Sequence, residues 1–168
     1  LAAVNRDFPP ALTSTKFAES KNVEEALVRK TGEVRGAYAQ LLHDVKSPAL
    51  RAAFEGAFNV SLKNTRTRVT LRGACAPKPC GGPGSVHTDS KAKVVSVLFY
   101  LDADWQGSDV AGNPNLFLLR SKSLTDVAGE VPAFQGNMVA FKNSARAWHG
   151  LVPFTGSRRA VQLNYEKR

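Results

Sequence analysis

The sequence lacks the features that mark membrane, disulfide-rich or disordered proteins. No run approaches the roughly 18 uninterrupted apolar residues that span a bilayer, so we expect a soluble protein. The only cysteines are Cys75 and Cys80, too few for a disulfide scaffold or a cysteine zinc site. Their pairing is left open, and we favour a reducing, cytoplasmic compartment.

No basic run or aromatic-interleaved basic stripe indicates a nucleic-acid surface, although the chain is strongly positive. Its 23 basic and 14 acidic residues give a formal net charge of +9. This charge favours anionic partners, including small carboxylate co-substrates. Because the basic residues are scattered, we interpret them as a solvated basic surface, and a nucleic-acid partner is not favoured.

Length and hydrophobic content predict a single domain over residues 1–168. The 168 residues, 43% of them hydrophobic, suffice for one substantial core but not for two ordinary domains. No internal repeat or linker divides the chain. Because the sequence begins with Leu1 rather than Met, we expect that residues precede it in the full protein.

Residues 1–64 are predicted to be mainly helical. Apolar residues recur at helical spacing between Leu27 and Val45, and Asn22 with Glu25 is a plausible capping pair for the start. Ser47 followed by Pro48 predicts the beginning of a further helix that extends to Ala57.

Residues 65–168 change to short β-rich runs separated by glycine and proline turns. The predicted strands are Thr67–Arg72, Val94–Leu101, Leu116–Arg120, Met138–Phe141 and Arg159–Tyr165. Helices followed by strands favour an α+β protein, with an antiparallel sandwich or jelly roll flanked by helices.

A candidate metal site begins at His87-Thr88-Asp89. In an extended segment, positions 87 and 89 project to the same side and can share one ion. With His149, 62 residues further on, they would supply the two imidazoles and one carboxylate that suit iron(II). Alone, the triplet also fits chance or a surface pair, and His149 also fits a structural histidine.

A strand near the end of the chain predicts a polar cavity wall. Arg158, Ala160, Gln162 and Asn164 alternate with a largely apolar set from Arg159 to Tyr165. A buried arginine on such a wall requires an anion, and its planar guanidinium matches a carboxylate with two parallel hydrogen bonds.

Together these segments resemble the 2-oxoglutarate and iron(II)-dependent oxygenase superfamily, in its prolyl-4-hydroxylase-like branch. The segments with this resemblance span roughly residues 67 to 165 and are fairly specific in their order and spacing. They are His87–Asp89, Val94–Trp105, Gly136–Phe141, Trp148–Gly150 and Arg158–Tyr165.

The resemblance implies a double-stranded β-helix core, a relative of the jelly roll, with N-terminal helices packed on one sheet. It implies that His87, Asp89 and His149 hold iron(II) and that Arg158 pairs with the distal carboxylate of 2-oxoglutarate. Further residues expected at the co-substrate are Tyr100, Arg72 and Gln162. A core aromatic is the alternative for Tyr100, and a surface arginine is the alternative for Arg72.

The implied activity is hydroxylation of a C–H bond with iron(II), 2-oxoglutarate and dioxygen, and decarboxylation of 2-oxoglutarate to succinate. The primary substrate could be a protein side chain, an amino acid or a small metabolite. One rival is a nucleic-acid demethylase, which usually has a second arginine near the position of Gln162 or Asn164. The other is a non-enzymatic jelly-roll binding module. The oligomeric state is not indicated.

Overall fold

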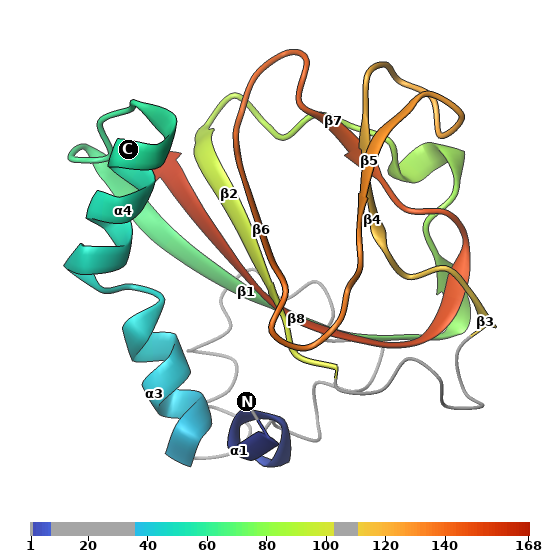
Figure 1. Ribbon diagram of the computed structural model, residues 1–168, viewed down its shortest axis with the longest axis horizontal. Coiled ribbons are helices and arrows are strands. Elements are labelled where there is room, and N and C mark those ends of the chain that lie inside the picture. Colours follow the sequence, from blue (N-terminus) through green and yellow to red (C-terminus); the bar gives the residue numbers. More distant parts are fainter. Residues whose placement is uncertain (1, 8–35, 103–110) are drawn as a thin grey trace.

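The computed structural model describes residues 2–7, 36–102 and 111–168, which form three helices, a short 3-10 turn and eight strands (Figure 1). The helices and the turn are α1 (Ala2–Arg6), α3 (Gly36–Asp44), α4 (Pro48–Phe58) and η2 (Pro83–Ser85). The strands are β1 (Thr65–Cys80), β2 (Lys93–Tyr100), β3 (Ala111–Gly112), β4 (Leu116–Leu119), β5 (Val127–Val131), β6 (Met138–Lys142), β7 (Trp148–Gly150) and β8 (Phe154–Lys167).

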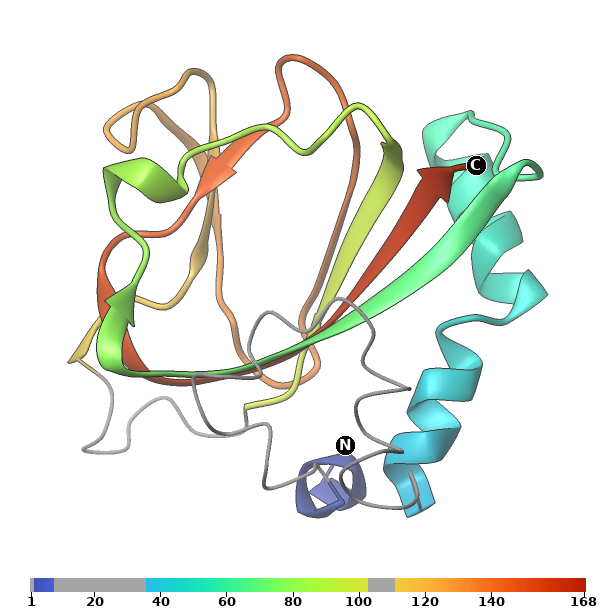
Figure 2. The same cartoon turned by 180° about the vertical axis from the view of Figure 1, so that it is seen from behind.

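The strands form two antiparallel sheets, as the β-rich segments predicted. The larger sheet has the order β1-β8-β2-β6, with β3 paired to β8, and the smaller has the order β5-β4-β7. Figures 1 and 2 show β1 and β8 running side by side as long curved strands from the C-terminal end towards β3. The protein is therefore mostly antiparallel sheet with a few helices.

Helix α4 begins where Ser47 and Pro48 predicted. Ser47 has extended backbone angles, φ −60° and ψ 146°, and its hydroxyl accepts a hydrogen bond from the Leu50 amide at 3.2 Å. The helix ends at Asn59, which adopts a left-handed conformation with φ 47°. Helix α3 coincides with the second half of the earlier helical pattern, whereas the predicted Asn22 and Glu25 cap lies outside the described residues.

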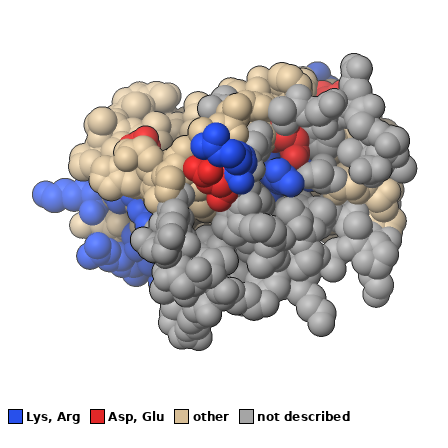
Figure 3. Space-filling model, turned by 90° about the horizontal axis from the view of Figure 1, so that it is seen from below, with Lys and Arg blue, Asp and Glu red and all other residues tan. Residues whose placement is uncertain are grey.

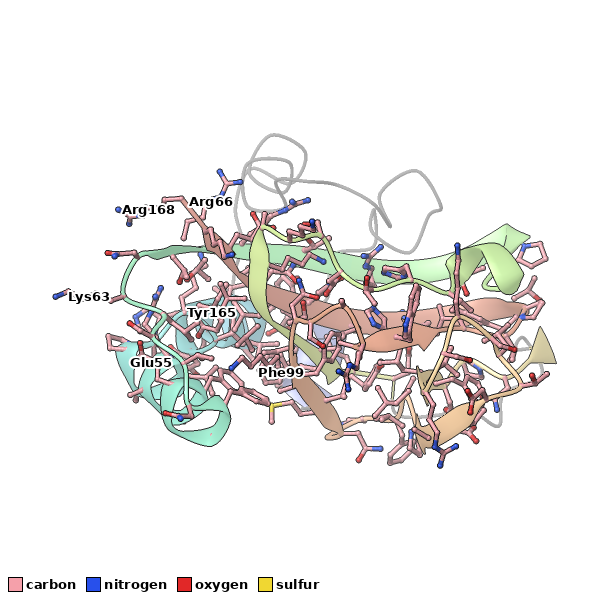
Figure 4. All side chains as sticks on the ribbon, turned by 90° about the horizontal axis from the view of Figure 1, so that it is seen from above. Glu55, Lys63, Arg66, Phe99, Tyr165 and Arg168 are labelled. Carbon is pink, nitrogen blue, oxygen red and sulfur yellow. The ribbon has the colours of Figure 1, made fainter. Side chains whose placement is uncertain are left out.

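The helices pack on the outer face of the larger sheet, as predicted. Their buried residues share one apolar core with the sheet, and this core comprises Val4, Tyr38, Leu42, Val45, Phe54, Leu62, Val69, Val95, Val97, Leu101, Val161, Leu163 and Tyr165. Tyr165 of β8 lies next to α4 (Figure 4), where its ring meets Phe54 edge-on at 6.1 Å and Arg51 at 5.0 Å. This face therefore stabilises the sheet and leaves the opposite face for a site.

Five of the strands were predicted, with shifted ends, and three were not. Strand β1 extends to Cys80, well beyond Arg72, across two irregularities in its register with β8. The three-residue β7 is too short to give a periodic pattern, and β5 is defined by its pairing with β4.

Cys80 is disulfide-bonded, a state more usual in oxidising compartments, so the predicted reducing compartment gains no support here.

Strand β8 separates two interiors through its alternating faces. Val161, Leu163 and Tyr165 belong to the core beneath the helices. Ala160 belongs to a second core, between the sheets, together with residues such as Tyr100. Arg158, Gln162 and Asn164 are all at least 93% buried on the same side as Ala160. The predicted polar wall is thus the inner face of the larger sheet.

Figure 3 shows basic side chains at the left edge of the face that it displays and a second group near its centre, beside acidic side chains. Lys63, Arg66 and Arg168 lie at the end where β1 begins and β8 ends (Figure 4). The buried Glu166 pairs there with Arg66 at 3.1 Å and Arg68 at 3.3 Å.

None of the described helices combines the length and the hydropathy required to cross a membrane.

We predict that Phe54→Ala lowers the free energy of unfolding by about 3–5 kcal/mol, because it leaves a cavity between α4 and the sheet. Urea unfolding followed by circular dichroism measures this. Phe134→Ala is the matched control: Phe134 is 46% exposed, so its removal should change stability little. Equal losses in the two variants would contradict the packing described.

Candidate metal centre

His87 and His149 are brought together by direct backbone pairing. Each amide donates to the other residue's carbonyl at 3.0 Å, so the two form an antiparallel bridge pair. Side chains of such a pair lie on the same face of the two segments. The imidazole centroids are 4.4 Å apart. The chain therefore places two histidines side by side although 62 residues separate them.

The loop before His87 is fixed to the segment after His149. The Gly82 amide donates to the Leu151 carbonyl at 2.7 Å, and the Ser85 hydroxyl accepts from the Leu151 amide at 3.0 Å. Gly81 has φ +92°, and a side chain there would collide with the backbone of Val152. These contacts set the position of His87 before any ligand binds.

Both imidazoles present the same nitrogen to the space between them. Nδ1 of His87 donates to the Ser85 carbonyl at 2.6 Å, and Nδ1 of His149 donates to the Ala147 carbonyl at 3.0 Å. Because a carbonyl can only accept, each Nδ1 carries a proton, so in the neutral form of each ring the lone pair that can bind a metal is on Nε2. Burial lowers the pKa of His149, which favours the neutral ring that a metal requires.

Asp89 completes the cluster with a nearly buried carboxylate. Its side chain is 5% exposed, and its Oδ1 lies 3.9 Å from Nε2 of His87. Lys93 donates to Oδ1 at 2.6 Å, and the Ser96 hydroxyl donates to Oδ2. Burial raises the pKa of Asp89, but the hydrogen bonds from Lys93 and Ser96 outweigh it, so the pKa is lowered and the group is ionised.

The donor set fits a divalent metal ion. One ligand atom from each of His87, Asp89 and His149 lies within 4.8 Å of the other two. Two imidazoles and one carboxylate are the ligand set typical of a non-haem iron(II) site with three protein ligands. The sequence predicted these three residues, and the structure brings them together.

A cavity of about 510 Å³ extends from the cluster along the inner wall of the larger sheet. It is lined by all three residues of the cluster and also by Arg72, Leu98, Leu116, Phe141, Arg158 and Gln162. Its volume is in the range of small-molecule sites. One cavity therefore joins the cluster to the arginine that the sequence singled out.

Arg158 has a buried charge with no anion at hydrogen-bond distance. It is 6% exposed, its Nε donates to the Pro114 carbonyl at 2.8 Å, and its Nη2 donates to the Tyr100 hydroxyl at 3.1 Å. Within residues 2–7, 36–102 and 111–168 it makes no ion pair. A buried, unpaired guanidinium is unfavourable, so this end of the cavity is suited to an incoming anion.

The other predicted co-substrate residues lie on or behind the same wall. Arg72 donates to Oε1 of Gln162 at 3.1 Å through Nε and at 2.8 Å through Nη2, and both residues line the cavity. Tyr100 is 1% exposed and does not line the cavity, but its hydroxyl contacts Arg158, which does. Burial raises the pKa of Tyr100, so its hydroxyl keeps its proton.

Sequence reasoning missed Lys93 and Ser96, which hold the Asp89 carboxylate. The spacing of Lys93, four residues after Asp89, was visible in the sequence but did not indicate a contact outside a helix. Ser96 is on β2 and meets Asp89 only because the loop between them folds back. The Pro114 carbonyl, which accepts from Arg158, likewise had no sequence signal.

Comparisons with known proteins support the fold. The structure resembles a prolyl-4-hydroxylase from Pseudomonas putida with a TM-score of 0.50 and 21% identity. The match covers 71% of this chain and 61% of that protein, so the chain spans about three fifths of its length. A protein of Bacillus endospore appendages, which form disulfide-linked pili, matches at a TM-score of 0.32 and 9% identity over 65% of this chain and 96% of that one.

Sequence comparisons add no family. No family model matches the chain, and no curated protein matches it. At 21% identity, the hydroxylase shows a shared fold, whereas the chemistry depends on the cluster and the cavity of this chain. The likeness thus shows the fold, and the His-Asp-His arrangement is a possible metal site of this chain's own.

We predict that the protein binds one Co²⁺ ion, a non-oxidising substitute for iron(II), and that His149→Ala weakens this binding at least about 100-fold because a protein ligand is lost. Anaerobic titration followed by visible absorption measures the affinity. His43→Ala is the control, since His43 lies on α3 with a side chain that is 80% exposed. Equal affinity in both variants would exclude His149 as a ligand.

Proposed function

We propose that this protein is an iron(II) and 2-oxoglutarate-dependent dioxygenase that hydroxylates a C–H bond of a protein side chain, an amino acid or a small metabolite. The proposal rests chiefly on one observation. The His-Asp-His cluster and the unpaired guanidinium of Arg158 face one cavity of about 510 Å³. When one end of 2-oxoglutarate binds a metal, the carboxylate at its other end needs a cationic partner. The cavity provides ligands for the metal and Arg158 for this carboxylate.

In this proposal His87, Asp89 and His149 hold iron(II), which supplies the activation of dioxygen when 2-oxoglutarate is bound. The Nδ1 hydrogen bonds keep both rings in the tautomer that directs Nε2 to the metal. The protein's contribution at this end is therefore ligand orientation, set before the metal arrives.

Arg158 and Tyr100 bind the distal carboxylate of 2-oxoglutarate in this proposal. The guanidinium already donates to the Tyr100 hydroxyl, so that hydroxyl can direct its own proton to a carboxylate beside Arg158. The apolar Leu98 and Leu116 line the same cavity and would exclude water from the chain between the two ends.

Arg72 and Gln162 stand between these two ends and are proposed to contact the co-substrate. Two hydrogen bonds from the guanidinium fix the Gln162 amide oxygen, and Gln162 Nε2 donates to Asn164 at 3.2 Å. Such a fixed polar pair orients a bound molecule without a large loss of side-chain entropy.

We also propose that the two sheets are those of a double-stranded β-helix.

The nucleic-acid demethylase remains a weaker alternative. Its usual second arginine on the last strand would lie near Gln162 or Asn164, and both of these side chains are neutral. The basic edge with Lys63, Arg66 and Arg168 could attract a phosphate backbone, in which case binding would weaken steeply with salt. The non-enzymatic alternative is a jelly-roll binding module, which predicts no conversion of 2-oxoglutarate.

Arg158→Met should weaken 2-oxoglutarate binding to the Mn²⁺-loaded protein at least about 30-fold, because the carboxylate loses a charged partner worth about 2 kcal/mol or more. Calorimetry under anaerobic conditions measures the affinity. Arg66→Met is the control, since Arg66 pairs with Glu166 at the edge and does not line the cavity. Unchanged affinity in Arg158→Met would remove this residue from the co-substrate site.

Wild-type protein with iron(II), ascorbate and dioxygen should convert 2-oxoglutarate to succinate, slowly without the primary substrate and faster with it. His149→Ala should lose this conversion, because the metal loses a ligand. Succinate is quantified by mass spectrometry. If wild-type protein binds iron and 2-oxoglutarate but forms no succinate, the binding-module alternative is correct and the enzymatic proposal is wrong.

A further inference from the structure

The two oxygens of the Asp89 carboxylate have different surroundings. Oδ1 faces the histidines, at 3.9 Å from Nε2 of His87, and accepts from Lys93 at 2.6 Å. Oδ2 accepts the short hydrogen bond from Ser96. With the carboxylate 5% exposed, water does not compete freely for either oxygen, so these two donors set its orientation.

Ser96 is a rigidly held donor. It is fully buried on β2, directly opposite Asn164 of β8, and β2 lies between β8 and β6 in the larger sheet. Its oxygen also lies 3.2 Å from Oδ1 of Asn164, which already accepts from Gln162. A hydroxyl has one proton, and the charged carboxylate is the stronger acceptor, so the proton goes to Asp89.

From this geometry we infer that Ser96 is a positioning residue that makes Asp89 a ligand through Oδ1 alone. The inference rests on the proposed function. Three single-atom protein ligands leave three of six positions open on iron(II), the number that a chelating 2-oxoglutarate and dioxygen require. A carboxylate that used both oxygens would take one of those positions, and the bond from Ser96 keeps Oδ2 directed away from it.

Lys93 assists from the other side of the carboxylate. Its ammonium donates to Oδ1 at 2.6 Å, and its side chain is 17% exposed at the cavity wall. An oxygen with two lone pairs in its plane can accept from Lys93 and bind a metal at once. The carboxylate is thus held at both oxygens, by Lys93 at Oδ1 and by Ser96 at Oδ2, and Ser96 holds the oxygen that is to be kept away from the metal.

The test compares Ser96→Thr with Ser96→Val. Threonine and valine have nearly the same shape, so both variants disturb the buried site alike, whereas only threonine keeps the hydroxyl. Two quantities are measured for each protein under anaerobic conditions: the affinity for Co²⁺, and the affinity of the Co²⁺-loaded protein for 2-oxoglutarate. Both use the visible absorption of Co²⁺, and neither depends on turnover.

Ser96→Thr is expected to behave like the wild type in both measurements. Ser96→Val is expected to lose about 10–100-fold in Co²⁺ affinity, the usual effect of removing a partner of a metal ligand. It should also bind 2-oxoglutarate at least about 10-fold more weakly once loaded, because a freed Oδ2 competes for an open position.

The outcomes separate this inference from the proposed function. If wild-type protein binds Co²⁺ and 2-oxoglutarate while Ser96→Val matches Ser96→Thr in both affinities, the role of Ser96 is wrong and the proposed function stands. If wild-type protein binds no Co²⁺, both are overturned.

Discussion

The candidate site depends on the two hydrogen bonds that join the backbones of His87 and His149. This bridge places the two imidazoles next to each other although 62 residues separate them in the sequence, and it requires no metal to do so. The loop contacts of Gly82 and Ser85 with Leu151 fix the same junction further along. The site is therefore preorganised, and the metal-binding free energy need not be spent on folding the segment.

Charge balance links the two ends of the cavity. At the metal end, the ionised Asp89 is offset by Lys93. At the other end, Arg158 has only a carbonyl and a phenol as hydrogen-bond partners, although it is almost fully buried. The folded protein thus retains a buried guanidinium that forms no ion pair with a described residue, although the Asp102 carboxylate attracts it at longer range, and an incoming carboxylate would relieve the cost of its burial. The buried guanidinium of Arg158 thus lowers the stability of the fold at the site where we propose that the co-substrate binds.

Local patterns predicted those parts of the structure whose causes are local. The start of α4 follows from the Ser47 cap, and the two faces of β8 follow from alternation between Arg158 and Tyr165. The three residues of the cluster were candidates from the His-x-Asp triplet and a distant histidine, and the resemblance then linked these segments, which periodicity alone could not do. Strand β7 and the contact of Ser96 with Asp89 depend on how distant segments meet, so no short pattern indicated them. The helical pattern before Gly36 lies outside the described residues.

The most direct test of the account is an anaerobic titration of the metal-free protein with iron(II) and 2-oxoglutarate, followed by visible absorption. If the cluster holds iron(II) and 2-oxoglutarate chelates it, a charge-transfer band of the chelate should appear in the wild type at one equivalent of each. His87→Ala should abolish the band, since one of the three metal ligands is removed. A wild-type protein that develops no band at saturating iron(II) and 2-oxoglutarate would contradict the account.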